Sequence, residues 1–228
     1  MISRDPFNIK NDTDSFRRII STRFNTENDI NKLISVFRHA SICNTLIQMA
    51  PNLPYSSCLN GFIYDVLNSV VSIIEKRERY FQLNCRSMIE HIARITANKV
   101  NNNNEFDLTV RRKDFDALKK CTLNSNWNYL HSAYSNACHY IHSSPSAKLN
   151  FASKFNSLLA SDLQTTQSKM IETLCKISSE LMKDVVFRYH QEISDVFFRN
   201  PADLKKIMGN RLYSHYKSII EPQHITTN

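Results

Sequence analysis

The sequence predicts an all-α protein, a multi-helix bundle of about seven or eight helices with a long C-terminal helix. Its 228 residues include only 2 Gly and 6 Pro, whereas turn-rich β architectures need far more glycine. Apolar residues recur at three- and four-residue steps along most of the chain, which is the period of an amphipathic helix. No alternating polar and apolar run of useful length indicates a strand.

Local signals mark the first two helices. After a polar arm over residues 1–12, Asp12 or Thr13 is the expected cap of a short helix. Thr26, followed three residues later by Asp29, resembles a capping box that opens the second helix.

Apolar stripes predict the remaining helices, and the charged group Glu75–Arg79 is interpreted as the turn of a helical hairpin. The Asn101–Asn104 run is a polar loop and the clearest internal break. The later predicted helices cover about 57–75, 84–95, 112–122, 127–142, 146–160, 165–198 and 201–219. We expect a single domain over residues 1–228, with a central bundle at 57–145, N-terminal helices at 13–50 and C-terminal helices at 146–220.

The formal net charge of +8 and the pI near 9.2 favour an anionic partner. Nucleic acid is the first candidate and an acidic protein the second, while the alternative is a basic protein with no such partner. The six cysteines contain no Cys-x-x-Cys pair. The start of the chain does not resemble a signal peptide, and we expect no apolar run long enough to span a membrane. These features predict a cytoplasmic location without membrane association.

One predicted helix carries charges that an ordinary core helix lacks. Met88 and Ile92 belong to its apolar stripe, whereas Arg86, Glu90 and His91 interrupt the apolar pattern. Arg86 and Glu90 are four residues apart and therefore share one side of the helix.

A second segment concentrates polar aromatic and histidine residues between positions 127 and 142. Tyr134, Cys138 and His142 are spaced four apart and share a helical face. His142 falls in the last turn, where a cation interacts favourably with the helix dipole.

These two patterns together resemble a known group of proteins. Arg-x-x-x-Glu, followed on a later helix by Tyr-x-x-x-Ser-x-x-x-His, is similar to the motifs of the DUF5677-type families, which are bacterial helical proteins similar to the HEPN superfamily. Arg86 and Glu90 match the first motif. Tyr134 and His142 match the second, with Cys138 where serine is commoner.

The resemblance covers about residues 57–145. It implies a helical, often dimeric protein that acts on RNA, either as a metal-independent endoribonuclease effector of a toxin–antitoxin or phage-defence system, or as a non-catalytic module that binds RNA, DNA or a protein partner. RNA is favoured over DNA. The nuclease members separate an arginine and a histidine by four to six residues, as Arg86 and His91 are separated. However, His91 lies about 140° round the helix from Arg86, so we predict a cluster of Arg86, Glu90 and His142 instead.

Metal-independent RNA cleavage needs a base for the ribose hydroxyl and a cation for the phosphorane. His142 or His91 is the candidate base, Arg86 is the candidate phosphate clamp, and Glu90 would orient one of them. The alternative is structural: Arg86 and Glu90 form an ordinary ion pair, and Tyr134 and His142 join two helices. The residues alone leave both interpretations open.

No cofactor and no metal is expected. Two glycines exclude a phosphate-binding glycine loop and a dinucleotide fingerprint. His139 and His142 are three residues apart with no acidic residue in their helix, unlike a helical zinc site. Aromatic residues of this helix are candidates for stacking on bases, although core packing is the favoured interpretation for most of them: Trp127, Tyr129, Tyr134 and Tyr140.

Overall fold

The computed structural model describes residues 7–99, 109–121, 125–145, 159–199 and 201–221. In these residues it has nine helices and no strand, which confirms the predicted all-α bundle. The helices are α1 (Ile9–Ser21), α2 (Glu27–Met49), α3 (Ser56–Ile74), α4 (Glu78–Thr96), α5 (Arg112–Cys121), α6 (Trp127–Ile141), α8 (Gln167–Arg188), α9 (His190–Val196) and α10 (Pro201–Ile220). The Asn101–Asn104 run and nearly all of the helix predicted at 146–160 lie outside the described residues.

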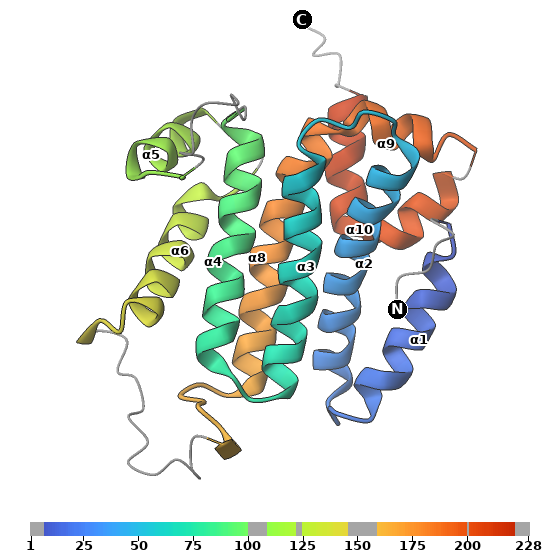
Figure 1. Cartoon of the computed structure of the whole chain (residues 1–228). Coiled ribbons are helices and arrows are strands. Elements are labelled where there is room, and N and C mark those ends of the chain that lie inside the picture. Colours follow the sequence, from blue (N-terminus) through green and yellow to red (C-terminus); the bar gives the residue numbers. More distant parts are fainter. Residues whose placement is uncertain (1–6, 100–108, 122–124, 146–158, 200, 222–228) are drawn as a thin grey trace, which may run out of the picture.

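The centre of the bundle consists of α2, α3, α4 and α8, which run side by side (Figure 1). The α3–α4 hairpin packs against α8, and α2 contacts both α3 and α8. On one side α1 covers α2, and on the other side α6 lies along α4 and carries α5. The short α9 and the final α10 pack against α2 and α8.

The core is made of the apolar stripes that the sequence period predicts. Burying one such side chain stabilises the fold by about 1.5–3 kcal/mol. Side chains with no exposed surface come from each of the four central helices: Leu33, Phe62, Met88, Ile92, Leu174 and Leu181. This apolar centre leaves Arg86, Glu90 and Arg94 of α4 on the outward side of the helix.

The N-terminal helix begins earlier than expected. It starts at Ile9, so Asp12 and Thr13 lie inside α1 and are buried instead of capping it. The reason is that Ile9 is itself a core residue, only 4% exposed, and it extends the buried stripe by one turn. Thr26 is the N-cap of α2 as predicted, but its side chain makes no capping bond. Asp29 instead accepts a hydrogen bond of 3.0 Å from the Ser168 hydroxyl.

Two breaks divide the helices predicted for the C-terminal part. The stretch expected as one helix at 165–198 is interrupted at Tyr189, where the backbone leaves the helical region. The ring of Tyr189 is buried, and its hydroxyl group donates a hydrogen bond to the Pro54 carbonyl at 2.7 Å. In α10 the chain kinks at Gly209, where φ is +72°, a value that glycine adopts without steric cost.

One helix meets the length and composition of a membrane span, which the sequence expectation did not include. By length and composition α3 is able to cross a membrane, with a mean hydropathy of 1.4. However, core helices of soluble proteins have the same properties, and Phe62, Val66 and Ile73 of α3 are buried in the bundle.

Candidate functional site

Charged residues line the outward side of α4. The opposite side of this helix is apolar, with Phe81, Met88 and Ile92 at most 1% exposed. Because helical residues four apart are neighbours, the apolar stripe that anchors α4 also fixes Arg86 and Glu90 on its outward side.

Glu90 lies between two arginines. The Nη2 atom of Arg94 is 2.9 Å from Oε1 of Glu90, whereas the Nη2 atom of Arg86 is 3.5 Å from Oε2. The Arg86–Glu90 pair that the spacing predicts is therefore present, but Glu90 is held more closely by Arg94, which the sequence reasoning did not include. At 3.5 Å the pairing of the Arg86 guanidinium group with Glu90 is loose, and because the side chain is 30% exposed the group is partly accessible to a ligand.

Tyr134 of α6 joins this group. The guanidinium carbon of Arg86 lies 5.5 Å from the centre of the Tyr134 ring, a cation–π distance, and Phe115 of α5 packs against the same ring at 4.8 Å. Burial works to lower the pKa of Arg86, but interactions with Tyr134 and Glu90 outweigh it and the pKa lies above its ordinary value. The sequence thus correctly predicts that Arg86, Glu90 and Tyr134 meet.

His142 does not join them. Its neighbours in sequence are fixed at the start of α4, where the Ile141 carbonyl accepts a hydrogen bond from Arg79 at 3.1 Å. His142 is the exposed C-cap of α6, eight residues after Tyr134, which corresponds to about 12 Å along a helix. The cluster of Arg86, Glu90 and His142 predicted from the sequence is therefore not assembled, because the run of α6 along α4 carries its last turn away from Arg86.

His91 lies on the side of α4 that faces α3. Its Nε2 atom is 3.4 Å from Oδ2 of Asp65 and 3.4 Å from the Ser87 hydroxyl. The imidazole ring packs directly on Gly61, where any Cβ atom would lie 2.3 Å from the ring. Glycine at this position of α3 is thus what makes room for the histidine.

The protonated form of His91 is stabilised by its surroundings. Burial works to lower its pKa, but hydrogen bonds and charge interactions with Asp65 and Cys58 prevail and raise the pKa to about 9. His91 is therefore an imidazolium at neutral pH, able to give up a proton or attract a phosphate but unable to act as a base.

A groove of about 700 Å³ follows the α3–α4 hairpin, and neither His91 nor Tyr134 is among its lining residues. Arg86, Ser87 and Glu90 line it from α4, and Asp65 lines it from α3. Two tyrosines in its walls are unusually open, because Tyr64 is 68% and Tyr80 is 63% exposed. Asparagine side chains supply further hydrogen-bonding groups: Asn68 and Asn84. We call this feature the α3–α4 groove.

The exposed tyrosines differ from the aromatic residues considered in the sequence. Trp127 is 1% exposed and Tyr140 donates a hydrogen bond to Glu78 at 3.1 Å, so these two residues are structural, as packing considerations favour. Tyr64 and Tyr80 were missed. The available signal was that neither belongs to the apolar stripe of its helix.

The sequence and the structure were compared with those of known proteins. No protein-family model, curated protein or solved structure matches the chain. Within the described residues, no group of three or more His, Cys, Asp or Glu side chains is placed to hold a metal ion. The geometry of the α3–α4 groove is consequently the main indication of a function.

Proposed function

We propose that this chain is a HEPN-like RNA-acting protein that binds single-stranded RNA in the α3–α4 groove. The observation that supports this most is the combination of the accessible, loosely paired Arg86 with the exposed rings of Tyr64 and Tyr80 in one groove. An arginine fork binds phosphate oxygens, and aromatic rings stack on unpaired bases without regard to sequence. A cytoplasmic location, a dimeric state and a role in toxin or phage-defence systems belong to the same proposal.

The lining of the groove has a formal charge of −1, with three acidic residues (Asp65, Glu75 and Glu90) against two arginines (Arg77 and Arg86). The positive charge that favours an anionic partner therefore comes from the helices around the groove. Residues 75–99 and 109–145, which contain α4, α5 and α6, hold eleven Lys and Arg against five Asp and Glu. Open aromatic rings beside asparagines favour RNA over an acidic protein, because they recognise bases as well as charge.

Binding of a labelled single-stranded RNA, followed by fluorescence anisotropy at several salt concentrations, tests the proposal. Arg86→Gln should weaken binding and lower the slope of log affinity against log salt by about 0.7, the value for one phosphate contact to a single strand. Tyr64→Ala and Tyr80→Ala should each cost about 1–3 kcal/mol of binding free energy. Arg23→Gln, which removes an equal charge from an exposed position after α1, should change neither affinity nor slope by a comparable amount. Wild-type protein that binds no RNA at low salt, or three groove variants that bind like wild type, would contradict the proposal.

RNA cleavage is the second candidate, because Arg86 and His91 are both partly exposed around Ser87. Arg86 would hold the phosphate and the His91 imidazolium would protonate the leaving oxygen. With its pKa at about 9, His91 cannot also remove the 2′-hydroxyl proton, and His142 is not beside it, so binding is better supported than cleavage. Incubation of RNA with EDTA-treated protein separates the two: products that disappear in both Arg86→Gln and His91→Gln identify a nuclease, and products that persist in both belong to another site or a contaminant.

A further inference from the structure

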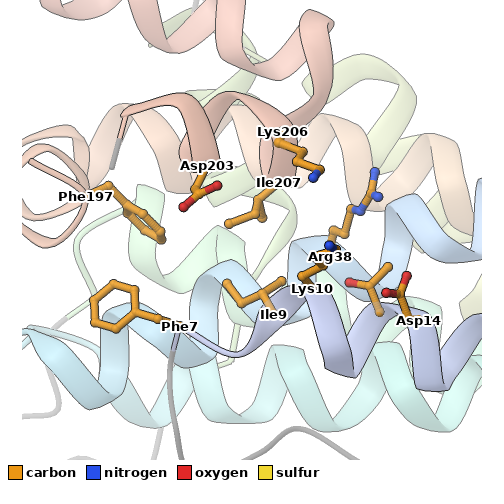
Figure 2. A pocket seen from close by; sticks show the side chains of 10 residues that line it. Phe7, Ile9, Lys10, Asp14, Arg38, Phe197, Asp203, Lys206 and Ile207 are labelled. Carbon is orange, nitrogen blue, oxygen red and sulfur yellow. The ribbon is translucent and has the colours of Figure 1, made fainter. Parts of the chain in front are cut away.

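A second cavity lies on the opposite side of the bundle from α6, where α1, α2 and α10 meet (Figures 1 and 2). Its volume is about 260 Å³. Ligand pockets usually measure about 300–1,000 Å³, so this cavity fits a small molecule and is too small for a dinucleotide. It shares no lining residue with the α3–α4 groove.

One end of this cavity is largely apolar, with Asp203 as the charged residue that Figure 2 places beside Phe197. Phe7 and Phe197 meet edge to face there, with ring centres 6.1 Å apart and an interplanar angle of 83°. Ile9 and Ile207 line the wall beside them, as Figure 2 shows. These side chains would surround the hydrocarbon part of a ligand.

The other end is cationic. Figure 2 shows Lys10, Arg38 and Lys206, from α1, α2 and α10, with their nitrogen atoms toward the end away from Phe7. Within the described part of the chain none of the three makes an ion pair closer than 4.0 Å, as Arg17 does with Glu27 at 2.7 Å.

Two carboxylates only partly balance these charges. Asp14 and Asp203 line the cavity as well, which leaves its lining with an excess of one positive charge. Burial, followed by the charge of Arg17, lowers the pKa of Arg38, and Asp14 offsets this only in part. An anion bound beside Arg38 would supply the missing negative charge.

A buried hydroxyl group gives an independent sign of a ligand. Thr13 lines the cavity and is 5% exposed, yet its Oγ1 atom has no hydrogen-bond partner among the described residues. Other hydroxyl residues inside helices of this protein donate to the carbonyl four residues earlier, as Ser41, Thr45 and Thr96 do. A buried polar group without a partner costs about 1–3 kcal/mol, and a polar ligand atom would remove that cost.

We infer that this cavity binds a small amphipathic organic anion. Arg38 and Lys206 hold its carboxylate or phosphate head, and the Thr13 hydroxyl donates a hydrogen bond to a ligand oxygen. Phe7 and Phe197 enclose its apolar body. This assignment is independent of RNA binding in the α3–α4 groove.

Calorimetric titration of the full chain with octanoate tests the inference, with phenyl phosphate as a second head group. We expect saturable binding at one site, with octan-1-ol and acetate at least about tenfold weaker, since each lacks one half of the recognised chemistry. Saturable binding of either anion supports the inference.

The variants separate the cavity from general charge effects. Arg38→Gln combined with Lys206→Gln should weaken binding at least about tenfold, and Thr13→Val, which keeps the shape of the side chain, should weaken it several-fold while the helical circular dichroism stays unchanged. Lys205→Gln removes the charge of the preceding residue, which does not line the cavity, and should bind like wild type. The inference is overturned if neither anion saturates the wild-type protein, or if all these variants bind equally well.

Discussion

The His91 side chain makes the stability of the protein depend on pH in a defined window. Its pKa is about 9 in the fold against 6.5 ordinarily, so the folded state binds this proton more tightly than the unfolded state. The stabilisation from His91 is complete below pH 6.5 and is lost as the pH rises through 9. The free energy of unfolding, measured by denaturant titration from pH 6 to pH 10, should fall across this window.

His91→Gln should remove that fall, and Asp65→Asn should reduce it by removing the carboxylate partner. His39 is a useful internal comparison, because burial lowers its pKa to about 4 and confines its effect to more acidic solutions. An equal pH dependence in wild type and His91→Gln would show that the raised pKa is not the cause.

At this scale the sequence predicts contacts within a helix better than contacts between helices. The Arg86–Glu90 pair follows from four-residue spacing alone. His142 was misplaced relative to Arg86, because the offset between α4 and α6 depends on how their apolar faces pack. The contact of His91 with Gly61 also joins two helices, and no local sequence pattern predicts it.

At the scale of elements, Glu78 ties the start of α4 to two distant segments. Its side chain is 1% exposed and accepts hydrogen bonds from the backbone N–H groups of Gln164 and Thr165 at 2.6 and 2.9 Å. The Tyr140 hydroxyl of α6 donates to it at 3.1 Å. The charged group around this residue is the turn that the sequence predicts, but Glu78 itself is a buried acceptor.

Glu78→Gln should therefore destabilise the protein, because the amide nitrogen of glutamine would face N–H donors. We expect a loss of about 1–3 kcal/mol in the free energy of unfolding, the cost of buried donors without partners. Glu75→Gln removes the same charge from an exposed position and should be nearly neutral. A loss of equal size in both variants would assign the effect to net charge.

Helix interiors were predicted correctly more often than helix breaks. The bounds of α5 and α6 agree with their apolar stripes to within a residue or two. No glycine or proline near Tyr189 marks the helix break there. The break results from the position of the Tyr189 ring in the core. Gly209 was visible in the sequence, but its kink requires a backbone angle that composition does not specify.

At the scale of the whole molecule, few glycines and a continuous helical period suffice to predict the class of fold. They do not tell which helices pack together. The central bundle expected at 57–145 is completed by helices from outside that range, since α2 and α8 both contact α3.

Two buried cysteines report on whether the bundle opens as one unit. Cys43 of α2 is fully buried with its thiol 3.8 Å from the Met182 sulfur of α8, and Cys85 of α4 is 1% exposed. Burial raises the pKa of Cys43 to about 12 and also raises that of Cys85, so each thiol reacts only after opening. Because α2, α4 and α8 share one core, we expect both to be alkylated by iodoacetamide at similar rates that rise together with denaturant.

Mass spectrometry of the digested protein measures each rate separately, and Cys175, which is only half-buried, provides the comparison for reaction in the folded state. Cys175 should be alkylated first and with little dependence on denaturant. Alkylation of Cys43 much faster than Cys85 would instead mean that α2 leaves the bundle while α4 stays folded. The packing of α2 between α3 and α8 argues against that result, because removing α2 would expose the apolar stripes of both neighbours to water.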